Sequence, residues 1–329
     1  MSQIRRQLLQ GVAGAAALAA LAPSTARAQA AWPSKTIRIV CGYPAGGLTD
    51  ALARAYAEHL GQKLGQSVVV ENKSGAAGMI AGAEVAKAAP DGHTLWFTIT
   101  GTLNQNRVFF KKMPYDPDKD FAYISGFGSG HLPLAVNANS PIRNMRDLVE
   151  LGKKQPITLG NYSTGSLPHM VAQQLNKRYG TQIEPVPYKG EAPMWLDLVS
   201  GQITAAMGSI LALSPHLQSG RLRPIAVPTK TRSALMPEVP TFEEQGFPDP
   251  VFVIEGWLGL LGPAGLPREI VQRLSALVQE AADTPRVRQL NKTFGLPDKP
   301  WTAAEFEKLD REVKPRWVEL ARELNLTLD

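Results

Sequence analysis

Short apolar runs alternate with helical patterns from residue 37 onward, and this alternation restricts the possible fold more than any other feature. The first part of the pattern is strand 37–41, helix 49–60 ending at Gly61, strand 67–70, helix 79–89 stopped by Pro90, and strand 93–100. Strands joined through helices form parallel sheets with right-handed crossovers. The pattern therefore predicts an α/β fold built on a parallel sheet.

The alternation returns after residue 132. The expected strands are 133–137, 157–160, 183–187, 203–207 and 222–227, with helices at 167–178 and 194–200 and a short helix at the capping-box sequence 241–244. After a strand at 253–261, only helices follow: 267–282, one with Thr284 as its cap, and one from the capping box at Thr302 to 324. A tail of helices must pack on an existing sheet, and we expect it to return to the first domain.

The length of 329 residues exceeds one typical core. We predict domain I over 32–132 plus 254–329, and domain II over 133–253. Residues 1–28 are predicted to be an export signal, because Arg5-Arg6 precede an apolar run and Ala26-Arg27-Ala28 supply a cleavage site. The run is shorter than the ~20 residues that span a bilayer. The signal predicts a periplasmic location, reached by the Sec route or the twin-arginine route.

Charge and cysteine content narrow the function. Removing Arg5, Arg6 and Arg27 leaves 32 basic and 29 acidic residues, a net charge of 32 − 29 = +3 instead of +6. No block of Lys and Arg remains, which argues against a nucleic-acid partner. Cys41 is the only cysteine, so no internal disulfide forms, and its place in an apolar strand predicts that it is buried.

The sequence YPAGGLTD, residues 43–50, is a glycine-rich turn between a strand and a helix. It lacks the Lys-Ser/Thr pair of a phosphate-binding P-loop and the glycine spacing of a dinucleotide fingerprint. Exposed amides at a helix N-terminus suit a small anion such as a carboxylate, while a purely structural turn stays open as an alternative. Asp50 lies in the first helical turn, where we interpret its carboxylate as structural rather than catalytic.

Three further loops repeat this arrangement: 71–78, 161–169 and 188–193. Ligands of open α/β sheets lie at the carboxyl ends of strands, so these loops are expected to converge. Gly160 and Ser163 lack the spacing of a nucleophile elbow, and packing or capping is favoured over catalysis for His169. Lys189 either attracts an anion or is simply solvated.

No metal or cofactor site is predicted. The sequence DPDKD at 116–120 superficially resembles calcium ligands, but the required glycine and acidic residue are replaced by Phe121 and Phe127. The five histidines, at 59, 93, 131, 169 and 216, lack the spacing of metal ligands.

Together these segments resemble one family. YPAGGLTDALAR, VVVENKSGAAG, VAKAAPDGHTL, MPYDPDKDF, STGSLPHM, VPYKGEAPMWLDLVSGQI, GRLRPIAV, LMPEVPTFEEQGFP and WLGLLGPAGLP match, in order, the pattern of Bug (TctC-like) receptors. These are the extracytoplasmic receptors of tripartite tricarboxylate transporters. The resemblance covers nearly the whole mature chain. It implies a type II periplasmic-binding-protein fold, with two α/β domains joined by two crossover strands and a carboxylate-bearing ligand between them.

The resemblance also implies the ligand-binding residues. They are Tyr43, Ala45, Gly46, Gly47, Thr49 and Asp50; Gly75, Ala76 and Gly78; Ser163, Thr164, Gly165, Ser166 and His169; and Gly190 and Ala192. The chain departs from the family pattern at Lys73-Ser74, where many members have Arg-Pro, and at Leu48, where a small or polar residue is common. Both departures lie near the expected pocket, so the resemblance fixes the receptor class better than the ligand.

The leading hypothesis is a monomeric receptor, not an enzyme, that captures a small organic acid and delivers it to membrane transporter subunits. One alternative is a sensor whose closed form is recognised by a signalling partner instead of a transporter. Another is an exported hydrolase using Ser163 or Ser166 with His169. The ligand could be an aliphatic diacid, an amino acid or an aromatic acid. Tyr43 and Trp257 would serve an aromatic acid, or Trp257 would pack in the core.

Overall fold

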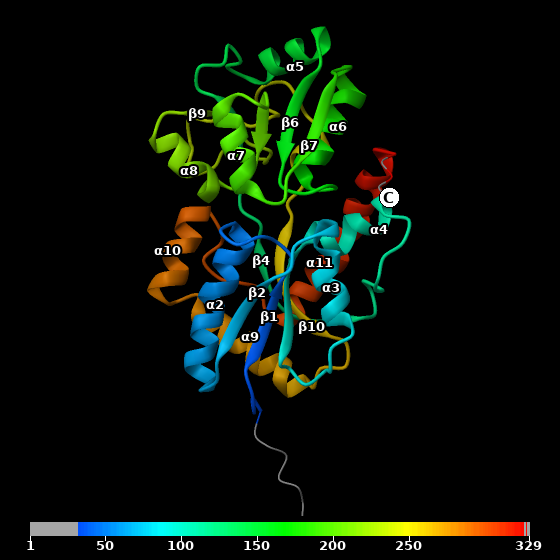
Figure 1. Ribbon diagram of the computed structural model, residues 1–329, viewed down its shortest axis with the longest axis vertical. Helices are drawn as coiled ribbons and strands as arrows, with labels where there is room; N and C mark the ends of the chain where they lie inside the picture. The colour runs from blue at the N-terminus through cyan, green and yellow to red at the C-terminus, as the bar shows by residue number, and fades with distance from the viewer. Residues whose placement is uncertain (1–31, 326, 328–329) are drawn as a thin grey trace, which may run out of the picture. The chain divides into compact units, whose positions relative to one another are not determined.

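The N-terminal part of the fold is a five-stranded sheet in the order β2-β1-β3-β10-β4 (Figure 1). The computed structural model describes residues 32–325 and 327. The strands are β1 (Ile37–Cys41), β2 (Val68–Asn72), β3 (Thr94–Ile99), β4 (Phe121–Gly128) and β10 (Trp257–Pro263). β1 pairs in parallel with β2 and β3, whereas β10 runs antiparallel to both β3 and β4.

A second five-stranded sheet has the order β7-β6-β8-β5-β9. Its strands are β5 (Leu134–Asn137), β6 (Ile157–Asn161), β7 (Ile183–Pro187), β8 (Ala205–Met207) and β9 (Leu222–Ala226). β6 pairs in parallel with β7 and β8, while β5 runs antiparallel to β8 and β9. The parallel pairing predicted from the strands at 37–41, 67–70 and 93–100 is confirmed, and each sheet also contains one strand of opposite direction, β10 or β5.

Most of the longer helices lie where the sequence pattern predicted them. They are α2 (Leu48–Leu64), η1 (Ala76–Gly78), α3 (Met79–Ala86), η2 (Gly101–Gln105), α4 (Asn106–Phe109), α5 (Met145–Lys154), α6 (Leu167–Tyr179), α7 (Glu191–Ser200), α8 (Ile210–Gln218), η3 (Pro250–Phe252), α9 (Arg268–Ala281), α10 (Pro285–Phe294) and α11 (Ala303–Glu323). The predicted caps of α10 and α11 are confirmed: the Thr284 side chain accepts from the Val287 amide, and Thr302 forms a complete capping box with Glu305.

Several local predictions are wrong. α2 continues through Gly61 and ends at Gly65, which takes the left-handed conformation (φ 65°). Thr241 and Glu244 exchange both capping-box hydrogen bonds, at 2.8 and 3.1 Å, but the chain there forms a turn and no helix follows. β4, α5 and α8 were not predicted at all.

β4 escapes prediction because its glycines weaken the strand pattern. An added Cβ at Gly126 would overlap the ring of Phe306, and one at Gly128 would lie 2.8 Å from Pro297 Cδ. The glycines therefore make room for the C-terminal segment that packs over this strand. The residues that these glycines accommodate, Phe306 and Pro297, lie 306 − 126 = 180 and 297 − 128 = 169 positions further along the sequence, so no local pattern reveals them.

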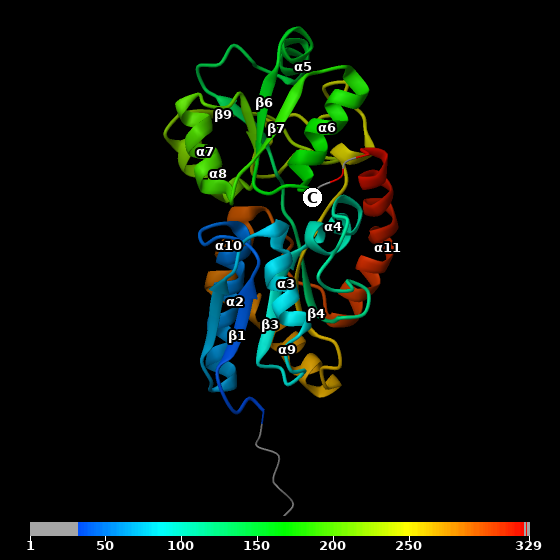
Figure 2. The same cartoon turned by 45° about the vertical axis from the view of Figure 1, so that its right-hand side comes forward.

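The C-terminal helix α11 contacts both halves of the structure (Figure 2). Its first half packs on the first sheet, with Phe306 in the core beside Trp257, which confirms the expected return of the tail. Its second half carries Trp317, Leu320 and Ala321 into the core beneath the second sheet. The helix is therefore shared between two hydrophobic cores.

Asp310, on α11, joins four elements through one buried carboxylate. Its oxygens accept from Asn104 Nδ2 at 2.7 Å, Tyr123 Oη at 2.6 Å and Trp257 Nε1 at 3.0 Å. These donors belong to η2, β4 and β10, and Asp310 itself is 0% exposed. A buried polar group is stable only when its hydrogen bonds are made, so each donor depends on this carboxylate.

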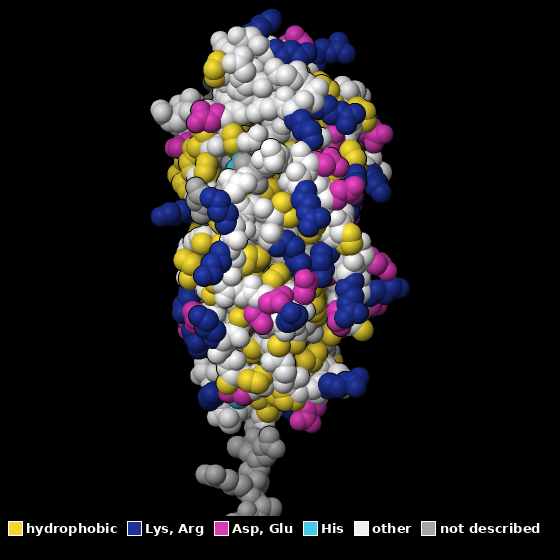
Figure 3. All heavy atoms as spheres, turned by 90° about the vertical axis from the view of Figure 1, so that its right-hand side faces the viewer, with side chains coloured by type: hydrophobic (Ala, Val, Ile, Leu, Met, Phe, Trp, Pro, Cys, Tyr) yellow, Lys and Arg dark blue, Asp and Glu magenta, His cyan; other side chains and the backbone are white. Residues whose placement is uncertain are grey.

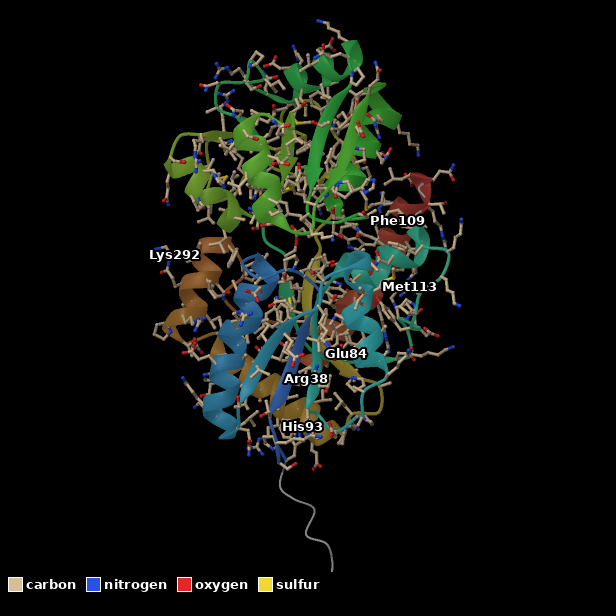
Figure 4. All side chains as sticks on the ribbon, in the orientation of Figure 1. Arg38, Glu84, His93, Phe109, Met113 and Lys292 are labelled. Atoms are coloured by element: carbon tan, nitrogen blue, oxygen red, sulfur yellow. The ribbon has the colours of Figure 1, made fainter. Side chains whose placement is uncertain are left out.

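The surface carries charges of both signs. Lys and Arg are mixed with Asp and Glu over the face drawn in Figure 3, in line with the absence of a basic block in the sequence. On β1, Arg38 lies between Glu71 and Glu84, at 2.7 and 2.8 Å (Figure 4). None of the helices in the described part of the chain combines the length and the apolar character needed to cross a membrane.

Cys41 is buried at the end of β1, as predicted. Burial raises the pKa of its thiol to about 11, so the reactive thiolate is scarce at neutral pH.

Replacing Asp310 with Ala should lower the free energy of unfolding by at least about 3 kcal/mol, because two buried donors, Asn104 and Trp257, and the half-buried Tyr123 lose their acceptor. Chemical denaturation measures the change. Glu307→Ala on the same helix is the control, since its ion pair with Arg311 is exposed and should be worth at most about 1 kcal/mol. Equal losses in the two variants would contradict the role given to Asp310.

Candidate functional site

A cavity of about 180 Å³ lies at the carboxyl ends of β1, β3 and the loops that follow β6 and β7. Both sheets contribute to its wall. From the first sheet and its loops come Tyr43, Pro44, Leu48, Thr100 and Gln105, among others, and from the second come Tyr162, Ser166, Leu167 and the residues 189–193. Its walls are mostly apolar, with a few polar groups, as in pockets for small molecules.

Three helices direct their N-termini into this cavity. Gly47–Thr49 of α2, Ser166–Leu167 of α6 and Gly190–Pro193 of α7 all lie in its wall. None of these three N-termini has a side-chain cap. Side chains cap α5, α8, α10 and α11, whereas α3 and α9 also lack a side-chain cap although their first turns lie outside the cavity wall. Uncapped first-turn amides carry partial positive charge and attract anions.

Ser166 provides a further polar group in the cavity wall. It is 3% exposed, and its Oγ has no hydrogen-bond partner among the described residues. A buried hydroxyl without a hydrogen-bond partner lowers the stability of the folded protein. A ligand that bonds to this hydroxyl removes the penalty, and the difference adds to the free energy of binding. The hydroxyl therefore indicates where a ligand oxygen would lie.

The predicted site residues divide into two groups. Those in the cavity wall are Tyr43, Ala45, Gly47, Thr49, Ser166, Gly190 and Ala192. Those outside the wall in this structure are Gly46, Asp50, Gly75, Ala76, Gly78, Ser163, Thr164, Gly165 and His169. Most of the second group belong to the same loops as the first, but Gly75, Ala76 and Gly78 lie in the loop 71–78, which contributes no residue to the wall.

Asp50 stabilises the loop 43–50 without lining the cavity itself. Its carboxylate accepts from the Gly46 amide at 3.0 Å, from Arg54 at 2.9 Å and from Asn72 at 2.9 Å. Burial alone would raise the pKa of Asp50, but these hydrogen bonds hold it below its ordinary value. Asp50 thus fixes the turn around Gly46 (φ 89°), which agrees with the structural interpretation.

The loop Gly75–Gly78 supports Tyr43. Tyr43 Oη and Thr102 Oγ1 are 2.9 Å apart, and Thr102 Oγ1 in turn donates to the Ala77 carbonyl at 3.2 Å. At Gly78 (φ 84°) an added Cβ would lie 2.8 Å from Thr102 Oγ1. Only glycine permits this close approach, so Gly78 positions the Tyr43 side chain that lines the cavity.

His169 fixes the third loop. Its Nδ1 accepts from the Gly165 amide at 3.0 Å, and burial lowers the pKa of the imidazole to about 4. The ring is therefore neutral at pH 7. Ser163 Oγ donates to the Thr164 carbonyl at 3.1 Å. The imidazole acceptor is thus already engaged by the backbone, an arrangement suited to the predicted capping role rather than to activating a serine.

Sequence reasoning missed several residues in the wall. Gln105, Leu132 and Trp317 come from η2, the segment between the sheets and α11. None belongs to a glycine-rich loop, so no sequence signal marked them. Trp257 is buried and its indole donates to Asp310, so it belongs to the core and also borders the cavity.

The wall also contains one carboxylate. Glu191 is the one Asp or Glu, and Lys189 the one Lys or Arg, among the described residues that line the cavity. Burial raises the pKa of Glu191. No group of three or more His, Cys, Asp or Glu in the described part of the chain is arranged to hold a metal ion.

Loops that follow β6 and β7 approach segments of the first half of the structure at two glycines. At Gly190 (φ 107°) an added Cβ would lie 3.0 Å from Pro44 Cγ. At Gly165 (φ 74°) an added Cβ would lie 2.8 Å from Phe109 Cδ2, and Phe109 belongs to the core of the second sheet (Figure 4). Both glycines therefore allow loops of the second sheet to approach segments of the first.

A family model decides the class of the protein. Residues 52–326 match the model of the tripartite tricarboxylate transporter family receptor, TctC. The chain belongs to this family. A UPF0065 protein encoded in the tcbD-tcbE intergenic region of Pseudomonas sp. (strain P51) is 32% identical over 98% of this chain and 95% of its own length. Protein BugT of Bordetella pertussis is 30% identical over 90% of this chain and 91% of its own length.

Solved structures of similar proteins agree. The periplasmic binding protein BugD is 27% identical, with a TM-score of 0.82 over 90% of this chain. Rpa4515 of R. palustris, solved with adipate, is 30% identical, with a TM-score of 0.84 over 90% of this chain. MatC of Rhodopseudomonas palustris, solved with malate, is 29% identical, with a TM-score of 0.80 over 88% of this chain. In each case all of the other chain is covered. The predicted periplasmic-binding-protein fold is thus confirmed.

Replacing His169 with Phe should lower the free energy of unfolding by about 1–3 kcal/mol, because the buried Gly165 amide loses its acceptor. The wild-type protein should also lose stability as the pH falls from 6.5 toward 4. In that range the unfolded imidazole takes up a proton and the folded imidazole, with its lowered pKa, does not. Denaturation at several pH values should show this slope reduced in the variant. An unchanged slope would contradict the assignment.

Proposed function

We propose that this receptor captures a small carboxylate-bearing molecule in the cavity and delivers it to the membrane subunits of a transporter. The observation that carries the proposal is the convergence of three uncapped helix N-termini on one cavity, beside the unpartnered Ser166 hydroxyl. Backbone amides and a hydroxyl there can bind a carboxylate without an arginine. The adipate and malate in the similar structures support the same ligand class.

Residues from both sheets line the cavity, and this arrangement fits capture of the ligand by closure of two domains. We assign domain I to 32–132 plus 254–329 and domain II to 133–253, with one sheet in each. A ligand favours the closed form only if it binds that form more tightly, so both domains must touch it. α2 from domain I and α6 and α7 from domain II meet this requirement.

The remaining assignments follow from the family. We place the receptor in the periplasm as a monomer, exported by the Sec or the twin-arginine route; the signal at 1–28 lies outside the described residues. Binding requires no cofactor or metal in this proposal, and no nucleic acid. We assign no enzymatic activity, because His169 engages the backbone instead of a serine.

Ser166→Ala tests the site directly. Its affinity for the bound acid should fall about tenfold, since one hydrogen bond to a charged group is lost. The free energy of unfolding of the ligand-free protein should not fall, because the variant loses a buried hydroxyl that bonds to no described residue. Calorimetry against a panel of mono- and dicarboxylates gives the affinities.

Ser214→Ala is the matched control for this experiment, because Ser214 Oγ donates to the Ile210 carbonyl on α8, outside the cavity wall. Its ligand affinity should equal that of the wild type. A folded wild-type protein that binds no organic acid of the panel would overturn the proposed function.

Gly190→Ala tests closure. The added Cβ would press on Pro44 across the cavity and force a side chain into a left-handed conformation, so ligand affinity should fall at least tenfold. Gly201→Ala separates the two effects, because Gly201 (φ 80°) has open space around it. That control should lose stability but keep its affinity. If both variants bind equally well, the contact with Pro44 does not contribute to closure.

A further inference from the structure

Glu191 introduces a negative charge where the proposed ligand also carries one. The residue begins α7 and lines the cavity, as do Gly190 before it and Ala192 after it. Its Oε1 accepts from the Ser209 amide at 2.8 Å and its Oε2 from Ser209 Oγ at 2.5 Å. Ser209 is 2% exposed, so the carboxylate is held in one orientation by a buried, rigid partner.

The Glu191 carboxylate has no cationic partner in the described part of the chain. Each carboxylate oxygen has two lone-pair sites, and Ser209 uses only one on each oxygen. The remaining sites accept hydrogen bonds and favour positive charge. A second carboxylate on the ligand would instead be repelled, strongly so in a cavity with low dielectric walls.

The neighbours of Glu191 do not remove this preference. Tyr43, Tyr162 and the exposed Lys189 are the other titratable groups in the wall. α7 packs against α8, β5, β6 and β8, and the only titratable side chain on these four elements is His216 of α8. Glu191 therefore supplies the one carboxyl group among the described residues that line the cavity.

We infer that Glu191 determines specificity and selects an aminocarboxylate: the amides of α2 and α6 hold the ligand carboxylate, and Glu191 accepts from its ammonium group. This inference rests on the proposed function and narrows its ligand class. It excludes simple aliphatic diacids as the preferred ligands. Burial raises the pKa of Glu191, so its carboxylate takes up a proton at a higher pH than an exposed glutamate does, and protonation weakens binding of the ammonium group.

Two matched pairs of ligands test the inference by calorimetry at neutral pH. Adipate and 5-aminopentanoate both have four methylenes between their end groups, and succinate and 3-aminopropanoate both have two. The wild-type protein should bind the amino acid of at least one pair tenfold or more tightly than its diacid. Glu191→Gln, which keeps the shape and can still bond to Ser209, should lose at least tenfold of that preference.

Glu184→Gln is the control, because Glu184 is an exposed residue of β7 outside the cavity wall. It should behave like the wild type. The affinity of the wild type for the amino acid should also fall as the pH is lowered, and that of Glu191→Gln should not. A wild type that prefers the diacid in both pairs, or a Glu191→Gln variant with unchanged preference, overturns the inference while leaving carboxylate binding intact. Failure to bind any of the four acids or the wider panel overturns the proposed function as well.

Discussion

The buried carboxylate of Asp310 connects the C-terminal helix to the rest of the structure. Its three donors lie on η2, β4 and β10, so one side chain joins segments separated by up to 206 positions in the sequence. Two of these segments border the cavity, because Gln105 ends η2 and Trp257 begins β10. The same helix then carries Trp317 into the cavity wall and the second core. The geometry of the cavity wall therefore depends on the hydrogen bonds of Asp310, a residue that does not itself line the cavity.

The cavity combines two kinds of electrostatic feature. Uncapped amides of α2, α6 and α7 favour negative charge, and Glu191 at the start of α7 favours positive charge. A carboxylate placed next to a helix N-terminus is itself stabilised by the helix, which allows Glu191 to remain in a buried place. The resulting wall has one charged group of each sign, and it suits a ligand whose own ends differ in charge.

Much of the fold followed from the sequence. The period of the apolar residues located most strands, and the capping residues Thr284 and Thr302 located helix starts, because both signals act over a few residues. β4 and the antiparallel direction of β10 were not predictable in this way. The glycines of β4 fit the ring of Phe306, and strand direction depends on how the chain returns between sheets. Similarly, YPAGGLTD identified Tyr43 and Thr49 but could not show that Asp50 faces its own loop.

The sequence by itself determined the class of the protein, since ordered motifs along the chain matched one receptor family. It also predicted three loops that border the cavity, because strand-to-helix turns rich in glycine expose backbone amides wherever they occur. Only the tertiary structure decided which residues of those loops line the cavity and which stabilise the loops from outside the cavity wall. It also brought Gln105 and Trp317 to the same wall and left Ser166 without a partner. Burial and hydrogen-bond partners depend on segments far apart in the chain, and these meet only when the chain has folded.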